Sequence, residues 1–318
     1  MIKSIKLSAF KGVKDMESLT FRDVNIIIGK NGGGKTTLIY AFSLLHILPQ
    51  VSSEPIDLMN LSYFHDSPIS EITMLDVWGS AFLLSSVYAS CEEASVTFNI
   101  NDEELIFRVS RAALVRKKGG SIKGLSILVI PSYNGFYNSV YRMMCRTFWS
   151  IMSRKSLVNN IVRALKDVSD IDVIKITPPM VFNEDMEPDI GVEIGSNGET
   201  IYIPFTELGS GLFRYAIVQM LIEIFDPKIL VIDDVDSYLN IITLRNFLNY
   251  LFSKKSISQI VLTAQTIDPV IAAIESVDDP NIVTIAIKKG KLKYRIHNID
   301  ELEEQLEIGM DPRLLYSV

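Results

Sequence analysis

The sequence predicts an α/β fold with a mixed β-sheet core, an antiparallel β subdomain and a helical lobe. Two observations give this prediction. Residues 29–37 read GKNGGGKTT and stand between an apolar run typical of a buried strand and a longer run typical of a helix. Residues 227–236 read PKILVIDDVD, a second buried-strand pattern that ends in carboxylates. Strand–loop–helix units of this kind are typical of α/β sheets.

The remaining elements follow from hydrophobic periodicity and turn signals. Residues 1–28 give two strand-like runs, 5–10 and 24–28, around a polar turn. Residues 94–100 and 105–111 alternate around an acidic turn, which predicts a hairpin. The other expected elements, in order, are a helix from residue 36, a loop at 116–124, a short strand within 125–133, one or two helices within 138–168, paired strands at 189–194 and 200–205, a helix at 208–225, a strand at 228–234, a helix at 242–254, a strand at 258–265 and, after residue 266, a strand, a hairpin at 284–296 and an acidic helix at 300–307.

Residues 29–36 satisfy G-x-x-x-x-G-K-[ST], the pattern of P-loop proteins that bind nucleoside triphosphates. Glycines let successive backbone N–H groups turn toward the phosphates, Lys35 is placed to meet the β- and γ-phosphates, and the Thr36 hydroxyl is placed to ligate Mg²⁺. The alternative is a chance glycine-rich loop, which the flanking strand and helix patterns disfavour. We therefore expect ATP and Mg²⁺ as cofactors. The candidate binding residues are Gly29, Lys30, Asn31, Gly32, Gly33, Gly34, Lys35, Thr36 and Thr37.

The second motif, KILVIDD, has the form of a Walker B strand. A carboxylate at the end of a buried parallel strand lies beside the Mg²⁺ of a phosphate loop, so Asp233 is a candidate metal ligand. Asp234 then points to the place of an attacking water and is a candidate catalytic residue. Apolar strands that end in acids are common, and the intact phosphate loop upstream decides in favour of the functional interpretation.

The composition predicts a soluble globular chain of one large or two ordinary domains, since 48% of its 318 residues are hydrophobic. No apolar stretch reaches the length of a membrane span, and the N-terminus alternates like a strand where a signal peptide would be continuously apolar. The cysteines Cys91 and Cys145 fit no metal or disulfide pattern. We expect a cytoplasmic protein without a membrane partner.

Charge is segregated along the chain, whose formal net charge is −7. Leu105 to Lys166 hold 12 basic residues and no acidic one, which leaves 19 basic against 38 acidic residues elsewhere. Such a segment favours a polyanionic partner, most commonly nucleic acid. Pairing with the acidic remainder, or solvation of helices, explains it nearly as well. The basic residues are Arg108, Arg111, Arg116, Lys117, Lys118, Lys123, Arg142, Arg146, Arg154, Lys155, Arg163 and Lys166.

A third motif makes a family resemblance specific. Residues 207–214 read ELGSGLFR, and LGSG at Leu208 to Gly211 is similar to the signature motif of ABC-type ATPases. The chain resembles the SMC/RecF/OLD-like branch of that superfamily, and most of all its stand-alone AAA-family ATP-binding proteins. The spacing also matches, with 175 residues from Lys35 to Ser210, 23 from Ser210 to Asp233 and 32 from Asp233 to Gln265.

On this resemblance, residues 1–48 and 200–318 form a discontinuous ABC-type ATPase core, and residues 49–199 form an insert with a β-hairpin and a basic helical lobe. The insert lacks sustained heptads and a Cys-x-x-Cys apex, so we expect no coiled-coil arm. The 52 residues after Thr266 leave no room for a nuclease domain. Any nuclease would be a separate effector chain.

The resemblance implies that two chains pair head to tail around ATP. Ser210 and Gly211 of one chain would meet the γ-phosphate held by the other, since their backbone N–H groups and the helix dipole attract anions. The alternative is that LGSG only caps a helix. The resemblance also places Lys11, in AFKG, near the nucleotide, although a surface lysine is the ordinary case.

Two positions depart from the family pattern. Asp234 stands where a glutamate is usual, and its reach to a water is shorter by about 1.5 Å, where errors of roughly 1 Å cost about a hundredfold in rate. Gln265 stands where a histidine is usual in the switch; its amide donates hydrogen bonds but supplies no positive charge. We expect slow hydrolysis, with Asp234 and Gln265 as the catalytic candidates.

Three function classes fit these observations. The leading one is an ATP-dependent switch of the DNA-repair or defence type, in which an ATP-driven dimer acts on nucleic acid or on a separate effector chain. The second is a nucleotide-binding scaffold without useful turnover, for which Asp234 and Gln265 argue. The third is a transporter nucleotide-binding subunit, against which the long interval between phosphate loop and signature argues.

Overall fold

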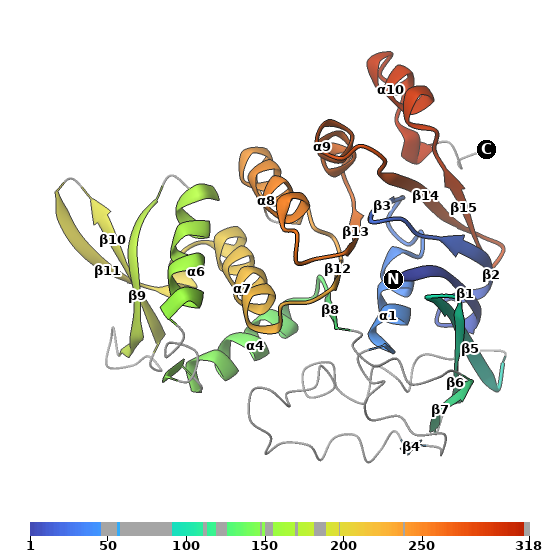
Figure 1. The fold of residues 1–318 in the computed structure, drawn as a ribbon, viewed down its shortest axis with the longest axis horizontal. Coiled ribbons are helices and arrows are strands. Elements are labelled where there is room, and N and C mark those ends of the chain that lie inside the picture. The colour runs from blue at the N-terminus through green and yellow to red at the C-terminus, as the bar shows by residue number, and fades with distance from the viewer. Residues whose placement is uncertain are drawn as a thin grey trace. The chain divides into compact units, whose positions relative to one another are not determined.

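The structure is a computed structural model (Figure 1). The chain divides into two units, the first made of Met1–Pro131, Pro227–Val235 and Lys254–Val318, the second of Ser132–Asp226 and Asp236–Ser253. The expected division into an ATPase core and an insert stays a prediction. The described residues are 1–45, 56–57, 91–110, 113–118, 126–146, 148–149, 155–168, 171–180, 189–196, 198–237 and 239–314.

One mixed sheet of 12 strands runs through the described part of the first unit, in the order β4-β7-β6-β5-β1-β2-β15-β14-β3-β13-β12-β8. Its end with β14, β3, β13, β12 and β8 is parallel, and its other end, from β4 to β2, is antiparallel. The predicted mixed sheet is thus confirmed. The strands are β1 (Ile2–Phe10), β2 (Val13–Thr20), β3 (Val24–Ile28), β4 (Ile56–Asp57), β5 (Glu93–Ile100), β6 (Glu103–Ser110), β7 (Ala113–Lys118), β8 (Ile127–Ile130), β12 (Ile229–Ile232), β13 (Gln259–Ala264), β14 (Asn281–Lys288) and β15 (Lys291–Ile296).

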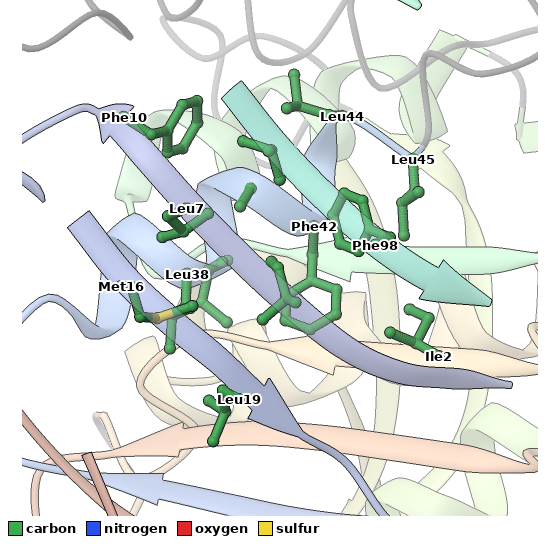
Figure 2. Packing of buried hydrophobic residues seen from close by; sticks show 14 of the residues in the cluster. Ile2, Leu7, Phe10, Met16, Leu19, Leu38, Phe42, Leu44, Leu45 and Phe98 are labelled. Carbon is green, nitrogen blue, oxygen red and sulfur yellow. The ribbon is translucent and has the colours of Figure 1, made fainter. Parts of the chain in front are cut away.

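Helix α1 (Lys35–Ser43) is buried between the antiparallel and the parallel strands. Phe42 of α1 points toward Phe98 of β5, with ring centroids 5.9 Å apart (Figure 2). The same core cluster includes Val129 of β8 and Val231 of β12. Apolar side chains therefore surround α1 instead of lining one stripe, as in a helix covered on several sides. This packing fixes the helix that follows the phosphate loop.

Buried amide side chains tie the N-terminal ends of the parallel strands together. Gln259, which begins β13, accepts a hydrogen bond from the N–H of Ile2 at 2.9 Å and donates to its carbonyl at 2.8 Å. Asn281 of β14 donates to the Asn25 side chain of β3 at 3.0 Å, and Asn25 donates to the carbonyl of Ile260 at 3.0 Å. Buried amides need such partners, so they hold the register of these strands.

The second unit contains four helices within the described residues and a three-stranded antiparallel sheet in the order β11-β10-β9. The helix α7 is buried along most of its length, and its Tyr215 meets Phe247 of α8 edge to face at 5.1 Å. This sheet and these helices confirm the predicted antiparallel subdomain and helical lobe. The elements are α4 (Asn134–Arg146), α6 (Lys155–Val168), β9 (Asp172–Met180), β10 (Asp189–Ser196), β11 (Glu199–Pro204), the 3₁₀ turn η3 (Phe205–Glu207), α7 (Ser210–Phe225) and α8 (Ile241–Ser253).

Three elements differ from the sequence prediction. Residues 13–20, expected within a polar turn, form β2, because a bulge in the pairing with β1 lets apolar residues spaced three apart all face the core. Residues 116–118, expected in a loop, end β7. The helix α9 (Asp268–Ser276) was not expected, and Pro269 lies in its first turn, where a missing N–H is tolerated. The chain ends with the expected acidic helix, α10 (Ile299–Glu307), and a 3₁₀ turn, η4 (Pro312–Leu314).

Among the described residues, no helix combines the length and the apolar composition that crossing a lipid bilayer requires.

The pH dependence of stability tests the placement of His297. This side chain follows β15, is 7% exposed, and has Nε2 2.7 Å from the Thr284 hydroxyl of β14. Burial, helped by the charge of Arg295, lowers the pKa of His297 from 6.5 to about 4. In this interval the unfolded chain binds more protons than the folded chain, so the free energy of unfolding falls as the pH falls from about 6.5 to about 4.

Urea unfolding at about pH 7 and about pH 4.5 measures this effect. We expect His297 to contribute a loss on the order of 2 kcal/mol in the free energy of unfolding, absent from His297→Gln. Carboxylates titrate in the same interval in both proteins, so the difference between the two proteins isolates the imidazole. Equal pH slopes would contradict a buried neutral histidine.

Candidate nucleotide-binding site

The parallel strands of the first unit end side by side at one edge of the sheet. Ile28 of β3 pairs with Ala264 of β13, and β13 pairs in turn with β12. The residues that follow these three strands therefore meet: the phosphate loop after β3, Asp233 after β12 and Gln265 after β13. The candidate site is built at this edge.

Backbone geometry explains the glycines at two positions of the phosphate loop. A Cβ at Gly29 would lie 2.4 Å from the backbone oxygen of Ile285, because β14 passes directly beside the loop. Gly34 has a φ of 98°, which L side chains rarely adopt, and a Cβ there would lie 2.6 Å from Leu292. The loop thus requires glycine for space at one end and for conformation at the other.

The side chain of Lys35 lies inside the loop and is only 6% exposed. Its Nζ donates a hydrogen bond to the carbonyl of Gly29 at 2.7 Å. A phosphate oxygen carries negative charge and is a stronger acceptor for an ammonium group than a neutral carbonyl. The arrangement therefore presents a buried cation that a phosphate group can draw away from Gly29.

The carboxylate of Asp233 is 1% exposed and accepts a hydrogen bond at each oxygen. The hydroxyl of Thr36, on α1, donates to Oδ2 at 3.2 Å, and the hydroxyl of Thr263, on β13, donates to Oδ1 at 2.6 Å. Thr36 and Asp233 thus place a hydroxyl and a carboxylate in contact. Mg²⁺ takes oxygen ligands of this kind and fills its other positions with waters and phosphate oxygens, so the residues present fit the ion.

Thr263 also positions the second carboxylate. Its hydroxyl oxygen accepts a hydrogen bond from the N–H of Asp234 at 2.8 Å. Asp234 has a φ of 47°, in the left-handed region that Asp and Asn tolerate better than most residues. Its Oδ2 accepts a hydrogen bond from Nε2 of Gln265 at 2.9 Å. The two expected catalytic residues are therefore in direct contact.

A cavity of about 290 Å³ brings most of the candidate residues together. Gly12 and Ile287 also line it, and the sequence prediction missed them, as it missed Thr263. The one signal for Thr263 was a polar residue in an otherwise apolar strand, whereas Gly12 and Ile287 reach the site only through the fold. The lining residues are Gly12, Asn31, Gly32, Gly33, Gly34, Lys35, Thr36, Thr37, Asp234, Gln265 and Ile287.

Lys11, the basic residue placed near the nucleotide by resemblance, precedes Gly12 in the turn between β1 and β2. Its Nζ lies 3.8 Å from the centroid of the Tyr40 ring on α1. Burial lowers the pKa of Lys11 to about 8. The lysine itself does not line the cavity, and its contact with nucleotide stays a prediction.

The signature residues lie in the second unit, at the start of α7. Gly209 precedes the helix with a φ of 87°, and Ser210 is exposed. The N–H of Phe213 donates to the carbonyl of Gly209 at 2.9 Å. The N–H groups of Ser210 and Gly211 belong to the first turn, which has no acceptors within an α-helix. These amides suit an anion, in agreement with either function assigned to LGSG.

A buried arginine holds this first turn in place. Arg214 is 8% exposed, and its guanidinium lies over the ring of Tyr137 on α4, 4.7 Å from the centroid. It also donates a hydrogen bond to the Asn134 side chain. The start of α7 is therefore tied to α4 within the second unit.

The basic segment is spread over both units, and some of its charges are paired. Arg108 lies 3.2 Å from Glu93, and Lys166 lies 3.0 Å from Asp172. The side chains of Arg111, Arg116, Lys117, Lys118, Lys123, Arg146, Arg154 and Lys155 lie outside the described part of the structure. A nucleic-acid surface on Leu105 to Lys166 stays a prediction.

Comparison with known proteins supports the fold. Residues 1–70 match the model of the AAA ATPase domain AAA_15. No curated protein matches the sequence. The Smc head domain of Pyrococcus furiosus, with an extended coiled coil and bound to the C-terminal domain of ScpA, is 12% identical, with 96% of this chain and 98% of that chain covered and a TM-score of 0.56.

Two further solved structures agree with this match. An SMC head bound to the winged-helix domain of ScpA is 14% identical, covers 95% of this chain and 99% of that chain, and has a TM-score of 0.57. The SMC head domain of Thermotoga maritima is 15% identical, covers 93% and 99%, and has a TM-score of 0.51. The chain thus has the ABC-type ATPase fold of SMC heads, as its motifs predicted.

Proposed function

We propose that the chain is an ATP-binding switch that hydrolyses ATP slowly, with ATP and Mg²⁺ bound at the cavity in the first unit. The observation that carries the proposal is that this one cavity collects residues 31–37 of the phosphate loop together with Asp234 and Gln265. The AAA ATPase match over residues 1–70 and the SMC-head fold support it.

Binding exchanges contacts within the protein for contacts with phosphate. The Nζ of Lys35 leaves the carbonyl of Gly29 for the β- and γ-phosphates, and the N–H groups of the glycine loop turn toward the phosphate oxygens. Thr36 and Asp233 hold Mg²⁺, which neutralises phosphate charge when bound. Lys11, through its place beside Gly12, adds a positive charge at the rim of the site.

Hydrolysis depends on the pair formed by Asp234 and Gln265. A water attacks the γ-phosphorus as its bond to ADP breaks, and the Asp234 carboxylate orients that water and accepts its hydrogen bond. The amide of Gln265 has two donor hydrogens, so it can hold Asp234 and a γ-phosphate oxygen together. Turnover is slow because aspartate is short and the glutamine brings no positive charge.

A second copy of the chain completes the site in this proposal. The exposed N-terminus of α7 carries Ser210 and Gly211, and the N–H groups of a helix start bind phosphate well. Head-to-tail pairing brings this helix start of one chain to the γ-phosphate held by the other. ATP then acts as a contact between two chains, and hydrolysis releases them.

The dimer acts on a partner, in a cytoplasmic setting and without a membrane. Two of the similar SMC heads were solved with a domain of ScpA, which supports a separate effector chain as partner here. Nucleic acid bound through Leu105 to Lys166 is the second candidate, in a repair or defence role. A salt-dependent affinity for nucleic acid would favour the latter.

A nucleotide-binding scaffold without useful turnover is the alternative function. The hydrogen bond from Gln265 to Asp234 favours it, because this contact occupies one oxygen of the carboxylate that would orient water. A transporter subunit remains the weakest candidate, since nothing in the fold comparison points to transporters.

Lys35→Ala should abolish ATP binding, because the variant loses the one ammonium group placed among the phosphate-loop N–H groups. Isothermal titration calorimetry with ATP and Mg²⁺ measures the affinity, which should fall at least about a hundredfold. Lys6→Ala, at an exposed position of β1, is the matched control and should bind as wild type does. Undiminished affinity in Lys35→Ala would remove the assigned site.

Substitutions at Asp234 test catalysis separately from binding. Asp234→Asn should cut single-turnover hydrolysis by about a hundredfold or more while ATP affinity stays within about twofold. Asparagine tolerates the left-handed backbone as aspartate does, so the variant should fold normally. Asp234→Glu should raise turnover, since the added methylene brings the carboxylate nearer the water. If Asp234→Asn hydrolyses at the wild-type rate, the scaffold function takes first place.

Ser210→Arg tests the completed site. ATP should drive wild type from monomer to dimer in light scattering, and the arginine should block this by its bulk while monomer affinity for ATP is retained. Ser210→Ala keeps the backbone N–H and serves as the control, with dimerisation largely preserved. An oligomer that forms without ATP and ignores Ser210→Arg would leave LGSG as a helix cap only.

A further inference from the structure

The 3₁₀ turn η4, near the end of the chain, reaches the switch that follows β13. Arg313 in this turn donates a hydrogen bond from Nη1 to the backbone carbonyl of Gln265. Gln265 in turn donates from its side chain to Asp234 at 2.9 Å. Arg313 itself does not line the cavity. It therefore touches the site through the backbone of a catalytic candidate.

An ion pair fixes the orientation of the Arg313 guanidinium. Its Nε donates to Oδ1 of Asp311 at 2.8 Å, and its Nη2 donates to Oδ2 at 2.6 Å. Two parallel bonds of this fork geometry hold a planar guanidinium more firmly than a single contact does. The hydrogen bond to Arg313 is the main cause that lowers the pKa of Asp311, and the charge of Lys30 in the phosphate loop adds to it.

The turn that carries this pair is anchored to the sheet. The carbonyl of Pro312 accepts a hydrogen bond from the Thr284 hydroxyl of β14 at 3.3 Å, and Pro312 is buried. Thr284 is fully buried and contacts His297. The carbonyl of Gln265 is thus linked, through Arg313 and the turn, to a central strand beside the phosphate loop.

We propose that Arg313 is a positioning residue for the switch: it holds the backbone of Gln265 so that the glutamine amide meets Asp234 and the γ-phosphate. This inference rests on the proposed ATPase function of the same cavity. A glutamine carries less charge than the histidine usual at this position, so its rate contribution depends more on placement. A rigid guanidinium on the main chain supplies that placement without entering the site.

Hydrogen exchange and hydrolysis together test the role of Arg313. In Arg313→Ala, amide exchange of residues 265–268 should rise about tenfold, because a hydrogen bond to a charged donor is lost. Single-turnover ATP hydrolysis should fall about tenfold, whereas ATP affinity stays within about twofold. Arg313→Lys should recover part of both losses, since one charged donor remains.

Two controls separate positioning from a general loss of structure. Arg295→Ala removes an arginine of the same unit whose partner is the exposed Glu301 at 3.7 Å, and it should change neither readout. In the Gln265→Ala background, Arg313→Ala should cost no further hydrolysis, because both changes remove the same placement. Should Arg313→Ala fail to fold, Asp311→Asn frees the guanidinium from its carboxylate and should move both readouts in the same direction.

The outcomes distinguish this inference from the proposed function. Unchanged exchange at residues 265–268 overturns the holding role, whether or not the chain hydrolyses ATP. An equal loss of hydrolysis in the Gln265→Ala background, or a parallel loss of ATP affinity, also overturns it, since Arg313 would then act elsewhere. Absence of ATP binding by wild type would refute the proposed function instead, and the exchange measurement would still decide whether Arg313 holds the segment.

Discussion

The buried carboxylate of Asp233 is the contact on which the site depends. A carboxylate that is 1% exposed is tolerated only with hydrogen-bond donors, and here the donors come from two other elements, Thr36 of α1 and Thr263 of β13. The requirement ties the end of β12 to the start of the phosphate-loop helix and to the neighbouring strand. Thr263 then carries the order one step further by accepting from the N–H of Asp234.

The opposite ends of the same strands are held by neutral groups. The side chains of Asn25, Gln259 and Asn281 are buried and bonded to one another or to backbone. Strands fixed in register at one end present their other ends at a constant relative height. The polar pins below and the Asp233 contacts above thus leave α1 and the phosphate loop little freedom to shift.

Local motifs made part of this predictable from sequence alone. The loop after β3, the strand before Asp233 and the hairpin of β5 and β6 depend on adjacent residues, and each was found where its pattern indicated. β2 was missed because a bulge breaks the alternation that identifies strands. Gly12, Ile287 and Arg313 reach the site from far along the chain, and no spacing rule joins them to the phosphate loop. The contact between Gln265 and Asp234 is of the same kind.

Two contacts within the site explain why a partner would matter to a slow ATPase. Lys35 is bonded to Gly29 and Gln265 to Asp234, so ATP must replace existing hydrogen bonds and gains only the difference in strength. The N–H groups at the start of a second chain's α7 replace nothing within this cavity. In the proposed mechanism their contribution to γ-phosphate binding is therefore largely additional. On this argument dimerisation, more than nucleotide binding by one chain, determines when Gln265 turns from Asp234 toward phosphate.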